Sequence, residues 1–585
     1  MQDDGKYASR FSAKPSGELC AVLPKEQQEH KMTKKAKKLL PFTIGALFGA
    51  MIFIGIFGTK IILPSNIEWI FAAPDDTTQH YLGWMYYRNT PWQFPIGMTE
   101  GLSSEGAVCC TYADVIPLFA VFFKLLSPIL PETFQYFGLW GIICFALNGG
   151  LGAVLLSRIK NNIIFTSIGS LFYSVFFPTI TRITHHNALG AIWLIIAAMI
   201  LTLDYKREYK HRFTPILLWT LVCVLAAIIH PYFIPMVYTI MLGYLILLVF
   251  KEKKIAHAAV TFVVSSVTAV ASLWILGAFE KNGSMTDNGF THYSANLNTF
   301  FNGRGISKYL SPLTINTGQG EGFGYLGLGM LVCCFLAIVT AVSRIGKKDG
   351  SSLKYIASYL KEHKVEISAL VVVFLVGFFW ATSTKVTLNE HVIFELHLSD
   401  FLMKKLSIFR ASGRFIWGPC LIVMTTALWI VSKLEFKTAI TAVFICAWLQ
   451  GMDVRSIRNV MRAQYINTEP YEYAVTDEEW ETISGGINEV VFLPLPMDYV
   501  AKTQLYYDFA RPAAYDHIKL SSFIVCRADY ATLKSYADEQ YSLLSSGKGR
   551  TDALYVFFKE EDIPSDVDNI IVYDIGEYKV ARVKK

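Results

Sequence analysis

The sequence predicts a polytopic α-helical membrane protein with about eleven transmembrane helices and a C-terminal soluble α/β domain. Two observations lead to this fold class. Of the 585 residues, 53% are hydrophobic and only 17% are charged, whereas average soluble proteins carry roughly 25% charged residues. Apolar stretches of membrane length recur from residue 40 to about residue 452 and then stop, which leaves a C-terminal segment of ordinary domain size.

The hydropathy pattern divides the chain into three parts. Residues 1–39 are polar and form a predicted cytoplasmic tail, and residues 40–452 form the transmembrane domain, whose first external loop is long and covers 60–133. Residues 453–585 form the predicted extracytoplasmic domain. We expect no cleavable signal peptide, because the first apolar stretch is long and no small-residue cleavage site follows it.

Positive charges near the ends of the apolar stretches predict the orientation. Lysine and arginine mark the cytoplasmic side of a membrane protein, and the turns between the basic segments carry almost no positive charge. The N-terminus is therefore predicted inside and the C-terminal domain outside. The basic segments are Lys31–Lys38, Arg158–Lys160, Lys206–Arg212, Lys251–Lys254, Arg344–Lys364 and Lys433–Lys437.

One apolar segment, Asp114–Leu130, is left out of the count of spans. It is short and contains two prolines and a lysine, so we interpret it as an interfacial or re-entrant helix of the first loop. A short tilted span is the alternative. The predicted spans are 40–59, 134–156, 162–180, 187–203, 213–229, 232–250, 255–278, 324–343, 366–382, 413–432 and 437–452.

The C-terminal segment alternates short β-rich runs with polar helical stretches. This alternation predicts a small α/β domain. The predicted strands are Glu489–Pro494, Ser522–Cys526, Ala553–Phe558 and Asn569–Tyr573, and the clearest helix is Tyr530–Leu544.

Two adjacent aspartates, Asp75 and Asp76, follow the first span and open the first external loop. Aspartate after proline is common in turns, so a solvated turn is one interpretation. Beside an aromatic and histidine-rich loop, a carboxylate can also act as a general base. A third interpretation is that the pair holds a divalent cation such as Mg²⁺ or Mn²⁺, and the sequence leaves these roles open.

Cationic and hydrogen-bonding residues gather in the other predicted external segments. Arg410 and Arg414 are spaced to share one face of a helix, and two guanidinium groups at a membrane surface suit a phosphate; the alternative is that they extend to lipid head groups. Arg182 and Arg304 are further candidates for binding the phosphate. The candidate substrate-binding residues are His80, Tyr81, His185, His186, His230, His292, Asn296 and Glu321.

Several other classes of site lack a signal in the sequence. The net charge of +6 needs no nucleic-acid partner, because positive residues beside membrane spans account for it. The ten cysteines have no zinc-binding spacing. Neither a Walker loop nor a dinucleotide-binding motif is present.

With these features in place, the chain resembles the GT-C superfamily of membrane glycosyltransferases, and more closely an uncharacterised bacterial family of such proteins. The resemblance covers roughly residues 40–452. It implies many transmembrane helices, an essential acidic residue in the first external loop and a polyprenyl-phosphate sugar as donor. The stretches that carry it are Gln79–Trp84, Trp92–Pro95, Phe134–Trp140, Tyr293–Leu297, Glu321–Gly327 and Phe409–Phe415, together with the Asp75–Asp76 pair.

The resemblance therefore implies an inverting glycosyltransferase of the bacterial inner membrane that acts on an extracytoplasmic cell-envelope glycan. In that scheme Asp76 is the base, Asp75 assists it, and Arg410 and Arg414 bind the donor phosphate. The alternative is a transporter or flippase of lipid-linked saccharides. That function normally needs polar groups inside the spans and repeated halves, which the sequence does not display. A catalytically inactive scaffold that presents the C-terminal domain is a third possibility.

Overall fold

The computed structural model describes most of the chain. Asp75, one of the two expected acidic residues, lies outside the described residues, as does most of the predicted cytoplasmic tail. The described residues are 25–72, 76–280, 289–346, 358–466, 471–495, 503–565, 567–576 and 578–584.

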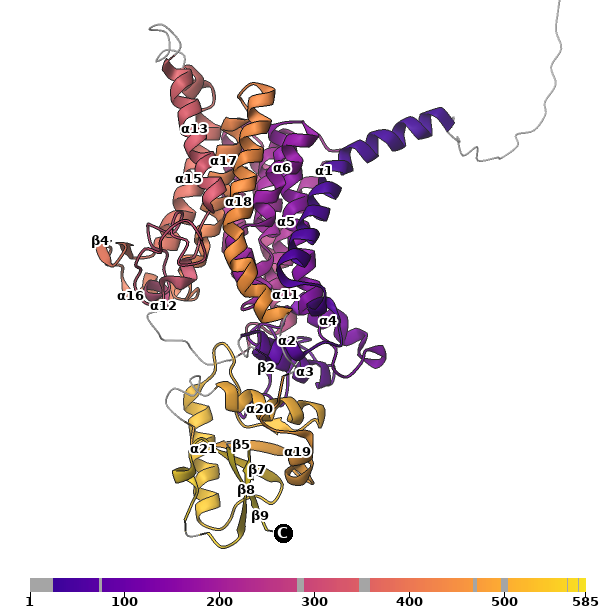
Figure 1. Cartoon of the computed structure of the whole chain (residues 1–585), viewed down its shortest axis with the longest axis vertical. Helices are drawn as coiled ribbons and strands as arrows, with labels where there is room; N and C mark the ends of the chain where they lie inside the picture. Colours follow the sequence, from indigo (N-terminus) through magenta and orange to yellow (C-terminus); the bar gives the residue numbers. More distant parts are fainter. Residues whose placement is uncertain are drawn as a thin grey trace, which may run out of the picture.

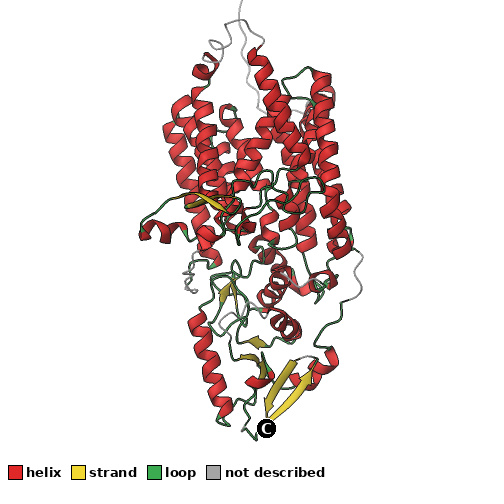
Figure 2. Ribbon diagram, turned by 60° about the vertical axis from the view of Figure 1, so that its left-hand side comes forward, coloured by secondary structure: helices red, strands yellow, loops and turns green. Residues whose placement is uncertain are grey.

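The described part of the chain is a tall bundle of apolar helices with a small sheet-containing domain at one end (Figures 1 and 2). Eight of its helical segments are long and apolar enough to cross a membrane, and three shorter apolar helices accompany them. Each of the eleven predicted stretches overlaps one of these helices, so the protein is a membrane protein.

Short connections join most of the bundle helices, and long loops separate α1 from α5, α11 from α13 and α15 from α17. Helix α1 (Lys25–Phe57) packs along α5 (Phe137–Ile159), as Figure 1 shows. The others are α6 (Ile163–Ser174), α7 (Phe177–Arg182), α8 (Trp193–Leu203), α9 (Thr214–Ile229), α10 (Phe233–Ile246), α11 (Ile255–Leu276), α13 (Leu328–Gly346), α15 (Lys364–Thr382), α17 (Trp417–Val431) and α18 (Phe436–Tyr465). Loops between them carry α12 (Gly289–His292), the hairpin of β3 (Lys385–Leu388) and β4 (His391–Glu395), and α16 (Asp400–Leu406).

The last bundle helix is longer than its hydropathy predicted. Helix α18 continues to Tyr465 rather than ending at residue 452. Asp453 ended the apolar pattern, but it is fully buried and accepts hydrogen bonds from the Tyr325 hydroxyl at 2.7 Å and the Leu328 backbone N–H at 2.9 Å. A buried carboxylate with partners is tolerated inside a helix bundle, so the soluble domain begins later than expected.

The first loop, 60–133, is a folded layer of its own. It contains α2 (Glu68–Phe71), α3 (Asp76–Asn89), the short paired strands β1 (Met98–Thr99) and β2 (Val108–Cys109), and α4 (Pro117–Leu125). Nine residues of α-helix extend about 14 Å, so α4 is too short to cross a membrane. Figure 1 shows this layer between the bundle and the C-terminal domain.

The C-terminal domain has a five-stranded mixed sheet in the order β6-β5-β7-β9-β8. The predicted strand at Ser522–Cys526 is wrong: the edge strand β6 is only Lys519–Leu520, and the residues after it leave the sheet toward the first loop. The other elements are α19 (Asp477–Ser484), β5 (Glu489–Leu493), α20 (Thr503–Tyr515), α21 (Tyr530–Ser545), β7 (Ala553–Phe557), β8 (Ile570–Ile575) and β9 (Tyr578–Val583).

The C-terminal domain docks on one side of α3. The Tyr86 hydroxyl donates to the Ile518 carbonyl at 2.8 Å, and the Tyr81 and Tyr515 hydroxyls lie 3.2 Å apart. The backbone N–H of Leu520 also donates to the Gly101 carbonyl. Helix α3 is therefore shared between the C-terminal domain and the bundle, and its other side carries the candidate site.

Candidate functional site

The candidate site begins at the N-terminus of α3. Asp76 is the first residue of this helix, where a negative charge is stabilised by the helix dipole. His80 follows one turn later, so the two side chains share one face. Thr77 anchors this end of the helix by donating to the Thr184 carbonyl at 2.6 Å.

His80 and Asp76 face three residues from other segments. We call the group of Asp76, His80, Asp114, His186 and His230 the histidine–aspartate cluster. The carboxylate of Asp114 lies 3.2 Å from His80 Nε2, 3.5 Å from His186 Nδ1 and 3.6 Å from His230 Nε2. Asp76 Oδ2 lies 3.4 Å from His186 Nδ1. Asp114 is therefore the centre of the cluster and Asp76 lies at its edge.

Burial distinguishes the two carboxylates. The side chain of Asp114 is 9% exposed and that of Asp76 is 35% exposed. Burial raises the pKa of Asp114, but the charge of His80 and the hydrogen bonds from His186 and His80 outweigh it and hold that pKa well below its usual range. Asp114 is therefore ionised and buried among its partners, whereas Asp76 is the more exposed of the two carboxylates.

The histidines differ in their protonation. Burial lowers the pKa of His80, but Asp114 and Asp76 outweigh this effect and raise it. At His230 burial dominates and lowers the pKa to about 4, so this ring is neutral at pH 7. Its Nδ1 accepts the Tyr232 backbone N–H at 3.2 Å, which leaves the Nε2 proton to face Asp114.

The backbone beside Asp114 is strained. Asp114 has φ of 53° and Ile116 has φ of 57°, in the left-handed region that a β-branched residue strongly disfavours. Such strain costs about 1–3 kcal/mol per residue, and the packing around the fully buried Ile116 must offset it. The first loop is thus held in a conformation that places the Asp114 carboxylate among the histidines.

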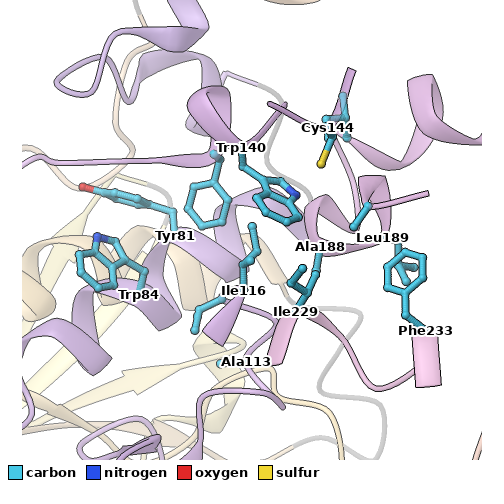
Figure 3. Packing of buried hydrophobic residues seen from close by; sticks show 14 of the residues in the cluster. Tyr81, Trp84, Ala113, Ile116, Trp140, Cys144, Ala188, Leu189, Ile229 and Phe233 are labelled. Atoms are coloured by element: carbon cyan, nitrogen blue, oxygen red, sulfur yellow. The ribbon is translucent and has the colours of Figure 1, made fainter. Parts of the chain in front are cut away.

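Buried apolar residues pack together beside the cluster, and we call those drawn in Figure 3 the apolar platform. Three cluster residues, and Asn187, which is hydrogen-bonded to His80, each stand next to a platform residue in the sequence. The pairs are His80 with Tyr81, Asp114 with Ala113, Asn187 with Ala188, and His230 with Ile229; all four platform residues are buried. Because interiors are close-packed, this arrangement fixes the positions of the polar side chains.

A second group, which we call the arginine–glutamate cluster, consists of Arg182, Glu321 and Arg414. Both Arg182 Nη2 and Arg414 Nε donate to Glu321 Oε2 at 2.7 Å. Burial raises the pKa of Glu321, but the charges of Arg414, Arg182 and, more weakly, His186 hold it well below its usual range. The two clusters are therefore within electrostatic reach of each other. The arginine–glutamate cluster carries a net positive charge, because it has two guanidinium groups and one carboxylate.

A close approach of two glycines allows the second cluster to form. A Cβ on Gly413 would meet the Gly322 Cα at 2.6 Å and its backbone N at 2.7 Å. Gly322 follows Glu321, and Gly413 precedes Arg414. A side chain at Gly413 would separate the two loops, so glycine here brings the carboxylate to the guanidinium.

Tyr232 lies between the two clusters. Its ring lies under the Arg414 guanidinium, 4.8 Å from the guanidinium carbon to the ring centroid, and its backbone N–H donates to His230. The tyrosine hydroxyl accepts the Ala411 backbone N–H at 2.7 Å. It connects the turn at His230 with the segment that carries both arginines.

The predicted helical pairing of Arg410 and Arg414 is wrong. Ala411 has a ψ of 70°, and the 3-10 helix η7 (Ser412–Ile416) begins only after it. Arg410 therefore points elsewhere, donating to the Tyr293 hydroxyl at 2.8 Å with its guanidinium over that ring. The cause is the non-helical backbone between the two positions.

The other predicted substrate-binding residues lie outside the two clusters. Tyr81 faces the C-terminal domain, His185 is half-buried, and His292 is exposed, with its ring edge-on to Tyr293. Asn296 donates its amide to Gln319, Thr387 and Asn389 and accepts the Asn298 and Asn389 N–H groups. Its hydrogen bonds are thus used within the protein. Arg304 donates to the Gly320 carbonyl at 3.0 Å.

Sequence reasoning missed Asp114 and Cys526. Asp114 was counted only as the start of an apolar stretch, although a carboxylate at such a boundary is itself a signal of function. Cys526 belongs to the C-terminal domain, and its N–H donates to the Tyr112 carbonyl at 2.9 Å. It is exposed to solvent, yet the surrounding protein atoms partly desolvate its thiol, and this effect together with the charge of Asp114 raises its pKa to about 11. The C-terminal domain thus contributes a side chain near both clusters.

Comparisons with known proteins identify a family but no activity. Residues 46–455 match the family described as "Domain of unknown function (DUF6311)", and residues 479–583 match the "DUF6311 C-terminal domain". No curated protein matches the chain.

Proposed function

The chain belongs to the DUF6311 family, and we propose that it is an inverting membrane glycosyltransferase. Its donor is a polyprenyl-phosphate-linked sugar, and its acceptor is an extracytoplasmic glycan or polymer of the cell envelope. The observation that carries the proposal is the position of an accessible carboxylate, Asp76, within electrostatic reach of the arginine–glutamate cluster. A base beside a cationic site is what transfer from a sugar phosphate needs.

Asp76 is the proposed base. It removes the proton of the acceptor hydroxyl, whose oxygen then attacks the anomeric carbon of the sugar. The bond from that carbon to the phosphate oxygen breaks, and the polyprenyl phosphate leaves with the negative charge. Asp114 is too buried and too strongly paired to serve as this base; it orients His80 and His186 instead.

Arg414 and Arg182 are the proposed ligands of the donor phosphate. Guanidinium groups bind phosphate through two parallel hydrogen bonds, and Glu321 holds both groups in place before the donor arrives. Arg410 is held by Tyr293 and serves as an outer contact for the donor. The cationic site stabilises the charge that develops on the leaving phosphate.

The proposal includes a topology. Eleven spans, of the GT-C type, would cross the bacterial cytoplasmic membrane with the N-terminus inside. The supporting observations are the eleven apolar helices and the one-sided distribution of positive charge. Both clusters and the C-terminal domain would then face outward, where the acceptor glycan lies. Docking of that domain on α3 supports a role in choosing the acceptor.

Donor turnover tests the proposal. The purified full-length protein in detergent is incubated with radiolabelled polyprenyl-phosphate sugars and cell-envelope glycans, and release of the polyprenyl phosphate is followed together with labelling of the glycan. We expect turnover that Asp76→Asn abolishes. Movement of a lipid-linked saccharide across vesicles without any transfer would overturn the proposal in favour of a transporter.

A further inference from the structure

The histidine–aspartate cluster contains a set of ligand atoms that the function proposed above does not use. His80 Nε2, His186 Nδ1 and a carboxylate oxygen of Asp114 lie within 4.8 Å of one another. We propose that these three residues bind one transition-metal dication of the Zn²⁺ type. The proposal concerns binding alone, so it stands or falls independently of the glycosyltransferase activity.

The distances between the ligand atoms fit a metal better than direct ion pairs. Charge-assisted N–H···O bonds usually measure about 2.7–2.9 Å, as both bonds to Glu321 Oε2 do. The Asp114 carboxylate lies 3.2 Å from His80 and 3.5 Å from His186. A tetrahedral Zn²⁺ with ligands at about 2.0–2.1 Å separates those ligands by about 3.3–3.4 Å. The observed separations bracket this value.

The hydrogen bonds of His80 hold it in the form that a metal ligand needs. Its Nδ1 lies 2.7 Å from Asn187 Oδ1 and donates to it, because the Asn187 amide nitrogen is used to donate to the Ile183 carbonyl at 2.6 Å. Nε2 is then directed at Asp114. A ligating histidine typically donates its second ring N–H to a fixed acceptor in this way, and Asn187 is fully buried.

His230 belongs to the surroundings of the site rather than to its ligands. Its Nδ1 already accepts the Tyr232 N–H, so its Nε2 carries the proton and faces Asp114 Oδ1 at 3.6 Å. A protonated nitrogen has no lone pair for a metal. His230 therefore orients the carboxylate, and its removal should weaken metal binding without abolishing it.

The types of the three ligand atoms determine the class of metal. Two imidazole nitrogens favour Zn²⁺, Co²⁺ and related ions, whereas Mg²⁺ and Ca²⁺ prefer oxygen ligands alone. Three protein ligands leave one position of a tetrahedral site open. Asp76 Oδ2 lies 3.4 Å from His186 Nδ1. The ligand set thus differs from the Asp75–Asp76 pair that the sequence offered for Mg²⁺ or Mn²⁺.

Cobalt substitution tests the site directly. The full-length protein, purified without a polyhistidine tag, is stripped with a chelator and titrated with Co²⁺, whose visible absorption is intense when four-coordinate. We expect one Co²⁺ per chain, displaced by Zn²⁺ but not by Mg²⁺. The variants His80→Ala and His186→Ala should lose stoichiometric binding, while His185→Ala, the adjacent histidine, should retain it.

One further variant and one measurement on wild type keep the test decisive if a ligand variant folds poorly. His230→Ala should retain one Co²⁺ with an affinity reduced about 10- to 100-fold, the usual effect of removing a group that supports a ligand. Thermal unfolding of wild type should shift upward with Zn²⁺, as it does when a ligand binds the folded state. Failure of wild type to bind Co²⁺ overturns the proposal, and so does equal loss in His185→Ala and His186→Ala.

Discussion

His80 Nε2 lies 3.2 Å from Asp114 Oδ2, and the two side chains are 1% and 9% exposed. The contact exists because the first loop folds back on itself. Gly83 allows it, since a Cβ there would meet the Ala113 Cβ at 2.9 Å. The start of α3 and the segment at Asp114 are thereby held together, and the histidine–aspartate cluster depends on this arrangement.

Replacing Asp76 with asparagine tests the base. Asparagine keeps the size and polarity of the side chain but cannot accept a proton at neutral pH, so we expect turnover of the donor to fall at least about 100-fold, the usual effect of losing a general base. The measurement is kcat at saturating donor. Glu132→Gln, an exposed carboxylate of the same loop, should keep the wild-type rate. Near-normal turnover of Asp76→Asn would remove the base assignment.

Replacing Arg414 with lysine tests the phosphate site. A lysine ammonium is a point charge and lacks the planar fork of arginine, so the KM for the donor should rise. Arg414→Ala should cost more, about 10- to 100-fold in kcat/KM, because a charge-assisted bond is worth about 1.5–3 kcal/mol.

The matched control is Arg158→Lys. Arg158 is also paired with a carboxylate, since it donates two hydrogen bonds to Asp204 at 2.7 and 3.1 Å. It lies near the far end of α5, a helix that spans about 34 Å. Donor kinetics should not change in this variant. If Lys matches wild type at both Arg410 and Arg414, the phosphate is bound elsewhere, and Arg182 and Arg304 are tested next.

Alanine at Gly413 should separate the two loops of the arginine–glutamate cluster. The new Cβ would meet the backbone of Gly322 at 2.6 Å, so the backbone must shift and the Arg414–Glu321 bond must lengthen. We expect a lower Tm in detergent and a loss of donor turnover. Gly418→Ala is the control, because nothing lies within 4 Å of its Cβ position and alanine is favoured in a helix. An unchanged Tm in Gly413→Ala would contradict the close approach.

Two cysteines test the proposed sidedness. Cys526 is solvent-exposed, and Cys20 belongs to the predicted cytoplasmic tail, outside the described residues. A membrane-impermeant thiol reagent should label Cys526 in intact cells and Cys20 only after permeabilisation, as judged with Cys20→Ser and Cys526→Ser variants. Labelling of Cys20 from outside would reverse the orientation and place the site in the cytoplasm.

The rate at which Cys526 is alkylated should depend on pH in an unusual way. Its pKa is raised to about 11 by burial and by Asp114, whereas an ordinary thiol has a pKa near 8.5. Because the thiolate is the reactive form, the rate with a neutral reagent should rise about tenfold per pH unit between pH 7 and pH 10. A plateau near pH 8.5 would show that the thiol is not desolvated by the surrounding elements.

The sequence by itself determined the apolar helices. A helix that crosses a bilayer must be continuously apolar over about 20 residues, so hydropathy locates it without knowledge of its neighbours. The sequence did not predict that Asp76 and His80 lie one turn apart on α3, because it indicated a loop there. The strands predicted to begin at Glu489 and Ala553 are strands in the structure, because the β-rich residue pattern that predicts a strand lies within the strand itself.

Only the tertiary structure determined which distant residues lie beside Asp76 and His80. Asp114, His186 and His230 come from separate segments, and strained backbone at Asp114 and the packing of Figure 3 bring them to α3. The pairing of Glu321 with Arg182 and Arg414, and the separation of Arg410 from Arg414, likewise depend on loop contacts. Such contacts arise from close packing between segments far apart in the chain, and no local pattern encodes them.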